Sequence, residues 1–307
     1  MSDSDKSEVH ADADAWPSLP FPEWKETCAT LHMWTQVVGK IRLALTPLEN
    51  HWWNVPLYVT ARGLTTSPMP YGARTLQIDF DFIDHQLVII CDDGTTKTVA
   101  LAPRTVADFH REVMQTLRNL GFEVRIWTMP VEIENPIRFE QDDQHASYDA
   151  EYAHRFWRAL LRADTVFKEF RAAYIGKSSP VHFFWGSFDL AVTRFSGRPA
   201  PEREGADAIT REAYSHEVIS HGFWPGSEAF PEPAFYSYTA PEPDGLSLAP
   251  LRPPSAFYSQ DLKEFLLRYD DVRRAHAPAH MLSEFLQSTY DAGADLAKWN
   301  RTALERK

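Results

Sequence analysis

The sequence predicts an α+β protein made of two similar halves, each a helix, an antiparallel β-meander and a second helix. Apolar residues recur at helical spacing in some segments and alternate with polar residues in others, and these segments come in the same order twice. The stretches TQVVGKIRLAL (35–45) and DTVFKEFRAAY (164–174) also align without a gap around Arg42 and Arg171. Downstream, 51–53 (HWW) corresponds to 182–184 (HFF). We therefore expect an internal duplication.

Length and composition allow two halves, each with its own core. The chain has 307 residues, of which 44% are hydrophobic and 13% aromatic, as in folded globular proteins. We expect a disordered, polar and acidic tail over 1–15, because it has little to bury. The first half is then 16–131, an acidic proline-containing linker 132–146, the second half 147–300 and a tail 301–307.

The first half opens with a helix and a strand. Apolar residues from Trp24 to Leu45 recur at helical spacing, and Pro47 ends that pattern. Residues 53–61 then alternate between apolar and polar, which predicts a half-buried strand. Pro56 lies inside it and restricts its early pairing to an edge or a bulge.

The rest of the first half predicts a meander and a closing helix. Residues 76–82 alternate, and LVIIC (87–91) follows a turn and precedes the turn signal DDG (92–94). Thr105 and Asp108 resemble a capping pair before an apolar helical stripe, which Gly121 closes.

The second half repeats this order. A long helix is expected from Phe156 to Tyr174, ending at Gly176, and the central stretch 179–198 is read as a strand. A polar loop (196–211), a strand (213–221), a strand at FYSY (235–238) and a last helix around 281–290 follow.

The central stretch carries polar and ionisable residues inside an apolar run. On a strand, its even positions include His182 and Arg194, whereas its odd positions include Trp185, Asp189 and Thr193. A buried ionisable group is costly unless it is paired or hydrogen-bonded. The odd row therefore resembles a pocket wall, and we expect Asp189 to have a cationic or hydrogen-bond-donor partner, with Arg194 or a histidine nearest.

The segment SHEVISH (215–221) is the nearest approach to a metal motif. It is not HExxH, because His216 and His221 are five residues apart. On a strand, Glu217 and His221 share a face, and Asp189 could join them if the two strands are neighbours. The alternative is a hydrogen-bond network at a strand edge, and we expect no tightly bound structural zinc.

Other motifs do not assign a reaction. GKSS (176–179) follows a helix and lacks the first glycine of a phosphate loop, so Gly176 is better explained as a helix cap. Trp224 stands beside glycine and proline in a predicted loop and is either a pocket rim or ordinary packing. No catalytic residue or cofactor is indicated. The candidate pocket residues are His182, Trp185, Asp189, Thr193, Arg194, His216, Glu217, His221 and Trp224.

Charge and apolar runs limit the partners that we expect. The net charge of −12 argues against nucleic acid, because phosphate binding needs a basic face. Cys28 and Cys91 stand in apolar patterns, which is typical of buried thiols. With no signal-peptide pattern and no apolar run of about 20 residues, we expect a cytoplasmic protein that does not bind membranes.

Four long segments resemble a known family. Residues 16–45, 50–72, 179–201 and 213–226 (the last reads AYSHEVISHGFWPG) are together similar to an uncharacterised bacterial domain-of-unknown-function family (DUF5996-like). The resemblance covers nearly the whole chain after the tail. It implies a single family unit from about Trp16 onward and a bacterial source, and it implies no activity, cofactor or catalytic residue.

Two function hypotheses follow. The first is a small-molecule enzyme or binder whose pocket is formed by the central stretch and SHEVISH, because both segments place ionisable groups among aromatic residues. The second is a non-catalytic structural or interaction module in which those polar groups satisfy one another. Convergence of Asp189, Arg194, His216 and Glu217 on one cavity favours the first hypothesis.

Overall fold

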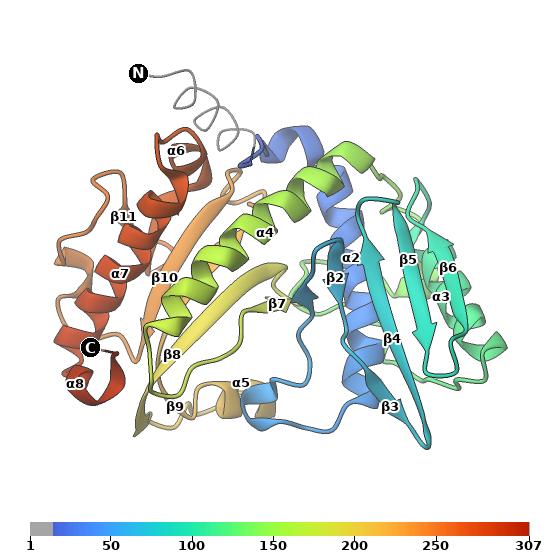
Figure 1. Cartoon of the computed structure of the whole chain (residues 1–307), viewed down its shortest axis with the longest axis horizontal. Coiled ribbons are helices and arrows are strands. Elements are labelled where there is room, and N and C mark those ends of the chain that lie inside the picture. Colours follow the sequence, from blue (N-terminus) through green and yellow to red (C-terminus); the bar gives the residue numbers. More distant parts are fainter. Residues whose placement is uncertain (1–14, 307) are drawn as a thin grey trace.

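The computed structural model describes residues 15–306 and has the predicted class: in both halves a helix precedes an antiparallel meander and a second helix follows it (Figure 1). Most of the predicted N-terminal tail, 1–14, and Lys307 lie outside the described residues. Trp16 is buried, and its ring centroid lies 6.1 Å from that of Tyr269.

The first half forms a six-stranded sheet in the order β1-β2-β4-β5-β6, with β3 paired to β4. Helix α3 begins as predicted, because the Thr105 side chain accepts a hydrogen bond from the Asp108 backbone N–H. The elements are α2 (Phe21–Leu45), β1 (Tyr58–Val59), β2 (Gly63–Thr65), β3 (Met69–Tyr71), β4 (Arg74–Asp81), β5 (Gln86–Cys91), β6 (Thr96–Ala100) and α3 (Val106–Asn119).

The strand predicted over 53–61 is much shorter in the structure. A 3-10 helix, η1 (Asn50–Trp52), precedes it, and only β1 remains extended in the sheet. His51 and Trp52 both have left-handed backbone angles, with φ of 57° and 60°. The chain then turns over 53–55, where the N–H groups of Trp53 and Val55 donate to the Asn50 and Trp52 carbonyls, so the first part of the predicted strand is not extended.

The second half forms a six-stranded sheet in the order β11-β12-β10-β9-β8-β7. Its main elements are α4 (Ala150–Ala172), β7 (His182–Phe184), β8 (Asp189–Pro199), α5 (Ala208–Ala213), β9 (His216–Trp224), β10 (Ala234–Ala240), β11 (Phe257–Ser259), β12 (Glu264–Arg268), α6 (Tyr269–Arg273) and α7 (Pro278–Leu296). The remaining elements are the short helices η2 (Phe139–Gln141), η3 (Leu246–Leu248) and α8 (Arg301–Leu304). Thus η2 lies in the predicted linker and α8 in the predicted C-terminal tail, where Arg301 pairs with Asp291, Asp295 and Glu305.

The central stretch is a hairpin and not the single strand that we predicted. The chain turns over 185–188, where Phe188 has a φ of 59° and its N–H donates to the Phe184 carbonyl at 2.8 Å. Strands β7 and β8 pair on either side of this turn. Trp185 therefore lies in the turn and is not part of the row that contains Asp189.

The two sheets meet at one pair of residues. Leu57 and Phe183 exchange backbone hydrogen bonds of 2.9 and 2.8 Å across the junction. Residues 51–53 do not correspond to residues 182–184 in the structure. Residues 51 and 52 belong to the 3-10 helix η1, whereas 182–184 form strand β7.

Arg42 and Arg171, which the predicted duplication aligns, have one feature in common. Each lies in the last turn of the first helix of its half and donates to a backbone carbonyl further along the chain, that of Thr66 or Ser179.

Helices cover opposite faces of the two sheets. In the view of Figure 1, α4 and α7 lie in front of the second sheet, whereas α2 and α3 lie behind the first. We call the face of the second sheet that points away from α4 and α7 the distal face. Side chains alternate along each strand, so every second residue of β8, β9 and β10 lies on the distal face.

Close packing between the halves predicts the effect of a Gly39→Ala substitution in α2. A Cβ at Gly39 would lie 2.3 Å from the ring of Trp185, whose Nε1 donates to the Val55 carbonyl at 2.8 Å. At an exposed position in a helix, replacing glycine by alanine stabilises the folded protein by about 1 kcal/mol. At a packed position, overpacking destabilises it by about 1–3 kcal/mol. We expect net destabilisation in urea unfolding, with recovery in a Trp185→Leu background; a more stable single variant would contradict this packing.

Candidate functional site

Five of the nine predicted pocket residues lie on the distal face. Thr193 of β8 contacts Ser220 of β9 through their hydroxyl oxygens, which are 2.9 Å apart, and β8 and β9 pair over most of their length. The alternation along each strand then places the five on this face: His182, Asp189, Thr193, His216 and Trp224.

Arg194 and His221 point the other way, toward α4 and α7. The Arg194 guanidinium carbon lies 3.4 Å from the Phe170 ring centroid, and its Nη2 donates to the Phe170 carbonyl. His221 Nε2 lies 3.1 Å from the Thr289 hydroxyl, and burial, with the charge of Arg194, holds the pKa of His221 well below its usual value. Both are buried packing residues under the helices and cannot share a pocket with Asp189. Glu217 also lies on their face of β9, so the convergence of Asp189, Arg194, His216 and Glu217 on one cavity does not occur.

The metal arrangement considered for SHEVISH is not assembled. Strands β8 and β9 are neighbours, but Asp189 lies on the distal face, whereas His221 lies under the helices. Glu217 forms an ion pair with Arg198, in which Glu217 Oε2 lies 2.6 Å from Arg198 Nη2. Among residues 15–306, no three His, Cys, Asp or Glu side chains are grouped so as to hold a metal ion.

Asp189 is the most constrained polar group on the distal face. The residue is 7% exposed, and its two carboxyl oxygens accept hydrogen bonds from the Ser187 and Tyr236 hydroxyls. The expected hydrogen-bond donors are present, but they are hydroxyls and not Arg194 or a histidine, and within the described residues the Asp189 carboxyl has no cationic partner. Burial raises the pKa of Asp189, and the two hydroxyls only partly offset this.

Two further carboxyl groups face Asp189. Burial raises the pKa of Glu264, on β12, to about 7, and the charge of Asp189 adds to that rise. The same two causes raise the pKa of Glu132. Asp189 is buried, Glu264 is half-buried and Glu132 is exposed, and ionisation of Asp189 disfavours ionisation of the other two.

Tyrosine and hydroxyl side chains continue from Asp189 across the distal face. The rings of Tyr236 and Tyr238, both on β10, stack with centroids 6.1 Å apart and planes at 10°. The Tyr238 and Tyr214 hydroxyl oxygens are 2.8 Å apart. Burial raises the pKa of Tyr236 and of Tyr238 well above the usual value, so both hydroxyls keep their protons.

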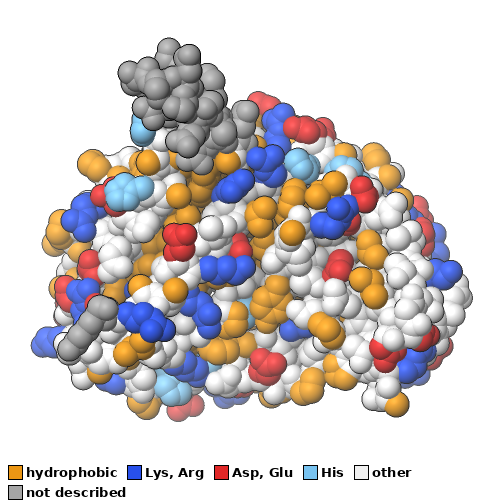
Figure 2. All heavy atoms as spheres, in the orientation of Figure 1, with side chains coloured by type: hydrophobic (Ala, Val, Ile, Leu, Met, Phe, Trp, Pro, Cys, Tyr) orange, Lys and Arg blue, Asp and Glu red, His pale blue; other side chains and the backbone are white. Residues whose placement is uncertain are grey.

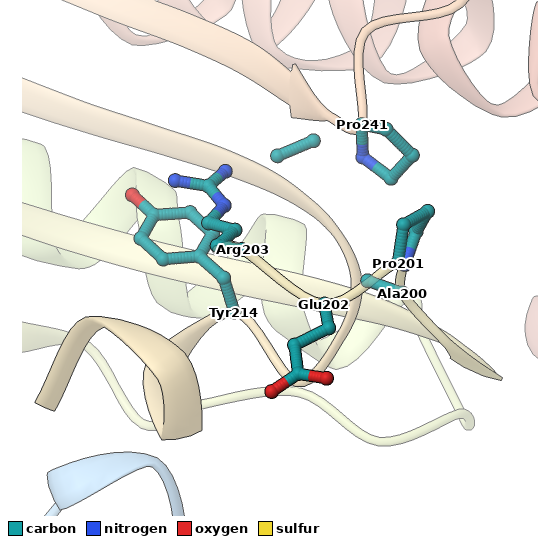
Figure 3. Close-up of a pocket in the computed structure, with 7 residues that line it drawn as sticks. Ala200, Pro201, Glu202, Arg203, Tyr214 and Pro241 are labelled. Carbon is teal, nitrogen blue, oxygen red and sulfur yellow. The ribbon is translucent and has the colours of Figure 1, made fainter. Parts of the chain in front are cut away.

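A cavity of about 160 Å³ opens at the far end of this tyrosine row (Figure 3). Arg203 lies over the Tyr214 ring with its guanidinium carbon 3.8 Å from the centroid. Ala200, Pro201, Glu202 and Pro241 complete the residues labelled in the view. The hydroxyl row therefore ends beside a space that solvent or a small ligand group can enter.

Several residues of this region were missed by sequence reasoning. Glu132 was assigned to the linker, and Glu264 falls in a segment for which no strand was predicted. The tyrosines carried a signal: in FYSY, Tyr236 and Tyr238 are two apart and must share a face of the predicted strand.

The face that carries α4 and α7 shows no comparable grouping. Basic, acidic and hydrophobic side chains are interspersed across it (Figure 2). Within residues 15–306, no helix has the length and apolar character needed to cross a membrane.

Comparison with known proteins identifies one family. The model of a family of unknown function, DUF5996, matches residues 16–306. No curated protein and no solved structure matches the chain.

Proposed function

We propose that this chain, which belongs to the DUF5996 family of unknown function, binds a small molecule on the distal face of its second sheet, with Asp189 as the central contact. The observation that carries the proposal is the Asp189 carboxyl itself, which is buried and faced by Glu132 and Glu264 without a cationic partner among residues 15–306. A desolvated carboxyl of this kind costs several kcal/mol when it is ionised. A sheet built only for stability would place an apolar residue there.

The chemistry of the region favours a ligand with a positive charge or several hydrogen-bond donors. Three carboxyl groups supply negative charge, and the rings of Tyr236 and Tyr238 supply π faces that attract a cation. An ammonium or guanidinium group at Asp189 would favour ionisation of the carboxyl and so remove the cost of its burial. We therefore favour a small amine as the ligand class.

An enzymatic role is favoured by one specific observation. Glu264 has a pKa of about 7, which lets the same carboxyl give up or accept a proton near neutral pH. In an enzyme, Glu264 would exchange the proton while Asp189 holds the substrate.

The alternative is a structural module in which the polar groups satisfy one another. The hydrogen bonds from Ser187 and Tyr236 to Asp189 favour it. A thermal-shift screen with small mono- and diamines, guanidines and quaternary ammonium ions separates the two. We expect a saturable rise in melting temperature with at least one amine; no shift across the panel contradicts the proposal.

The Glu264→Gln variant tests the titration that this role needs. Between pH 4.5 and about 7 the folded wild type keeps a proton on Glu264 that the unfolded chain has lost, so wild-type stability falls as the pH rises through that window. Glutamine does not titrate. We expect the free energy of unfolding of Glu264→Gln, measured in urea, to rise relative to that of the wild type between pH 5 and pH 8, by on the order of 2–3 kcal/mol.

The exposed Glu169→Gln substitution on α4 is the matched control, and it should show no such pH dependence. Buried histidines titrate in wild type and variants alike, so their contribution cancels in the difference. A Glu264→Gln difference that is the same at pH 5 and pH 8 would show that Glu264 ionises normally.

A further inference from the structure

We propose that the junction of the two sheets is a binding site for an oxyanion group, of the kind that a phosphate or a carboxylate carries, held by His182, Arg42 and Arg171. This inference goes beyond the proposed function, because it rests on other residues and on a ligand of opposite charge. It concerns the place where the two halves meet at Leu57 and Phe183.

His182 forms the floor of this site. Its side chain is fully buried at 0% exposure, and neither ring nitrogen has a hydrogen-bond partner within the described residues. Its neighbours are aromatic, with ring centroids of Trp53, Tyr58 and Phe184 at 5.9, 5.5 and 5.5 Å. An imidazole with two unsatisfied nitrogens is costly inside an aromatic cluster, and phenylalanine would fill the same space without that cost.

Arg42 reaches the same cluster from the end of α2. It is 6% exposed, and its guanidinium carbon lies 5.5 Å from the Tyr58 ring centroid. One terminal nitrogen donates to the Thr66 carbonyl, but Nε has no partner in the part of the chain that the structure describes. A buried N–H donor is thus left beside the ring that also contacts His182.

Arg171, the counterpart of Arg42 in the second half, supplies another charge. Its Nε donates to the Ser179 carbonyl at 2.7 Å, while the residue itself is exposed. Burial, together with the positive charges of Arg42 and Arg171, lowers the pKa of His182 to about 3. Both guanidinium groups therefore act on the same imidazole.

No carboxylate neutralises these two arginines by an ion pair within residues 15–306. Glu49 is the acid whose charge acts on Arg42, and Arg42 itself contacts the Thr66 carbonyl and the Tyr58 side chain, to which it also hydrogen-bonds. Elsewhere in the protein arginines are commonly paired, as Arg62 is with Asp81 and Asp84. An oxyanion would supply the missing negative charge and accept from Arg42 Nε and a His182 nitrogen.

The rim of the site is basic and aromatic. Lys177 Nζ lies 5.3 Å from the centroid of Trp53 and 2.6 Å from His51 Nε2. Trp53 is partly exposed and lies next to His182, so its ring separates the histidine from solvent. A ligand would reach His182 by displacing this ring, with Lys177 beside it.

The experiment titrates sodium phosphate, sodium sulfate and sodium acetate into the full chain at constant ionic strength, with sodium chloride as the reference salt. Calorimetry and thermal shift are read in parallel. We expect saturable binding of at least one of the three, and acetate against phosphate shows whether a carboxylate or a phosphate is preferred. His182→Phe should abolish the response, and Arg171→Gln should weaken it at least tenfold.

Arg111→Gln is the matched control, because Arg111 is an exposed arginine paired with Asp108 on α3. Arg111→Gln should bind the oxyanion as the wild type does. Asp189→Asn should do so as well, so a negative result for the oxyanion site can be told apart from a negative result for the amine site. Shifts of equal size in wild type, His182→Phe and Arg171→Gln would mean an adventitious ion only. Either that result or no saturable binding with any of the three salts overturns the proposal.

Discussion

Replacing His182 by phenylalanine is expected to stabilise the free protein, and the gain should increase as the pH falls. The variant keeps an aromatic ring against Trp53, Tyr58 and Phe184 and removes two buried nitrogens that have no partner within the described residues. Leaving such groups unsatisfied costs about 1–3 kcal/mol. Phenylalanine is slightly larger than histidine, so overpacking offsets part of this gain equally at every pH.

The pH dependence is the sharper part of this prediction. The unfolded chain protonates His182 below a pKa of about 6.5, whereas in the folded protein burial and the two arginines lower that pKa to about 3. Between these values only the unfolded state binds the proton. Wild-type stability therefore falls by about 1.4 kcal/mol per pH unit in this window, and phenylalanine avoids that loss. From pH 7.5 to pH 5, the difference in free energy of unfolding between His182→Phe and the wild type should increase by about 2 kcal/mol in favour of the variant.

Urea unfolding at pH 5, 6 and 7.5 measures this difference. His280→Gln is the control, because His280 is exposed on α7 and should not change the pH dependence. If wild type and His182→Phe lose stability in parallel on acidification, His182 is protonated normally in the folded protein. Both the buried position of the ring and the oxyanion site would then be wrong.

Asp189→Asn should keep or raise stability, whereas a structural ion pair at Asp189 would predict a large loss. The partners of Asp189 are the hydroxyls of Ser187 and Tyr236, and a hydroxyl can donate or accept, so neither is left unsatisfied by an amide. Removing the Asp189 carboxylate also removes the negative charge that disfavours ionisation of Glu132 and Glu264. If Asp189 instead formed a buried ion pair, the same change would cost about 3–5 kcal/mol.

Thermal and urea unfolding of Asp189→Asn decide between these outcomes. Asp79→Asn is the control, because Asp79 is a half-buried strand carboxylate that accepts from the Gln77 side chain on the first sheet. A loss of several kcal/mol in Asp189→Asn alone would identify Asp189 as a structural group.

The sequence predicted the order of elements because that order depends on local periodicity. The helices α2 and α3 and the hairpin of β4 and β5 follow from spacing and turn residues alone. The central stretch was misread, because an apolar run does not show where a chain reverses. The turn at 185–188 depends on Phe188 adopting a positive φ, which few non-glycine residues do.

The site could be predicted only in part, for the same reason. Alternation correctly separates His216 from Glu217 and His221, but it does not show which face the helices cover. The approach of Glu132 and Glu264 to Asp189 is a tertiary contact between segments far apart in the chain, and no local pattern encodes it.

On this account, Asp189 on the distal face binds a positively charged small molecule. The most direct measurement is calorimetric titration of the strongest amine from the thermal-shift screen into wild type, Asp189→Asn and Asp79→Asn. We expect wild type and Asp79→Asn to bind alike and Asp189→Asn, although folded, to bind at least tenfold more weakly. Equal affinity in all three proteins would contradict the claim.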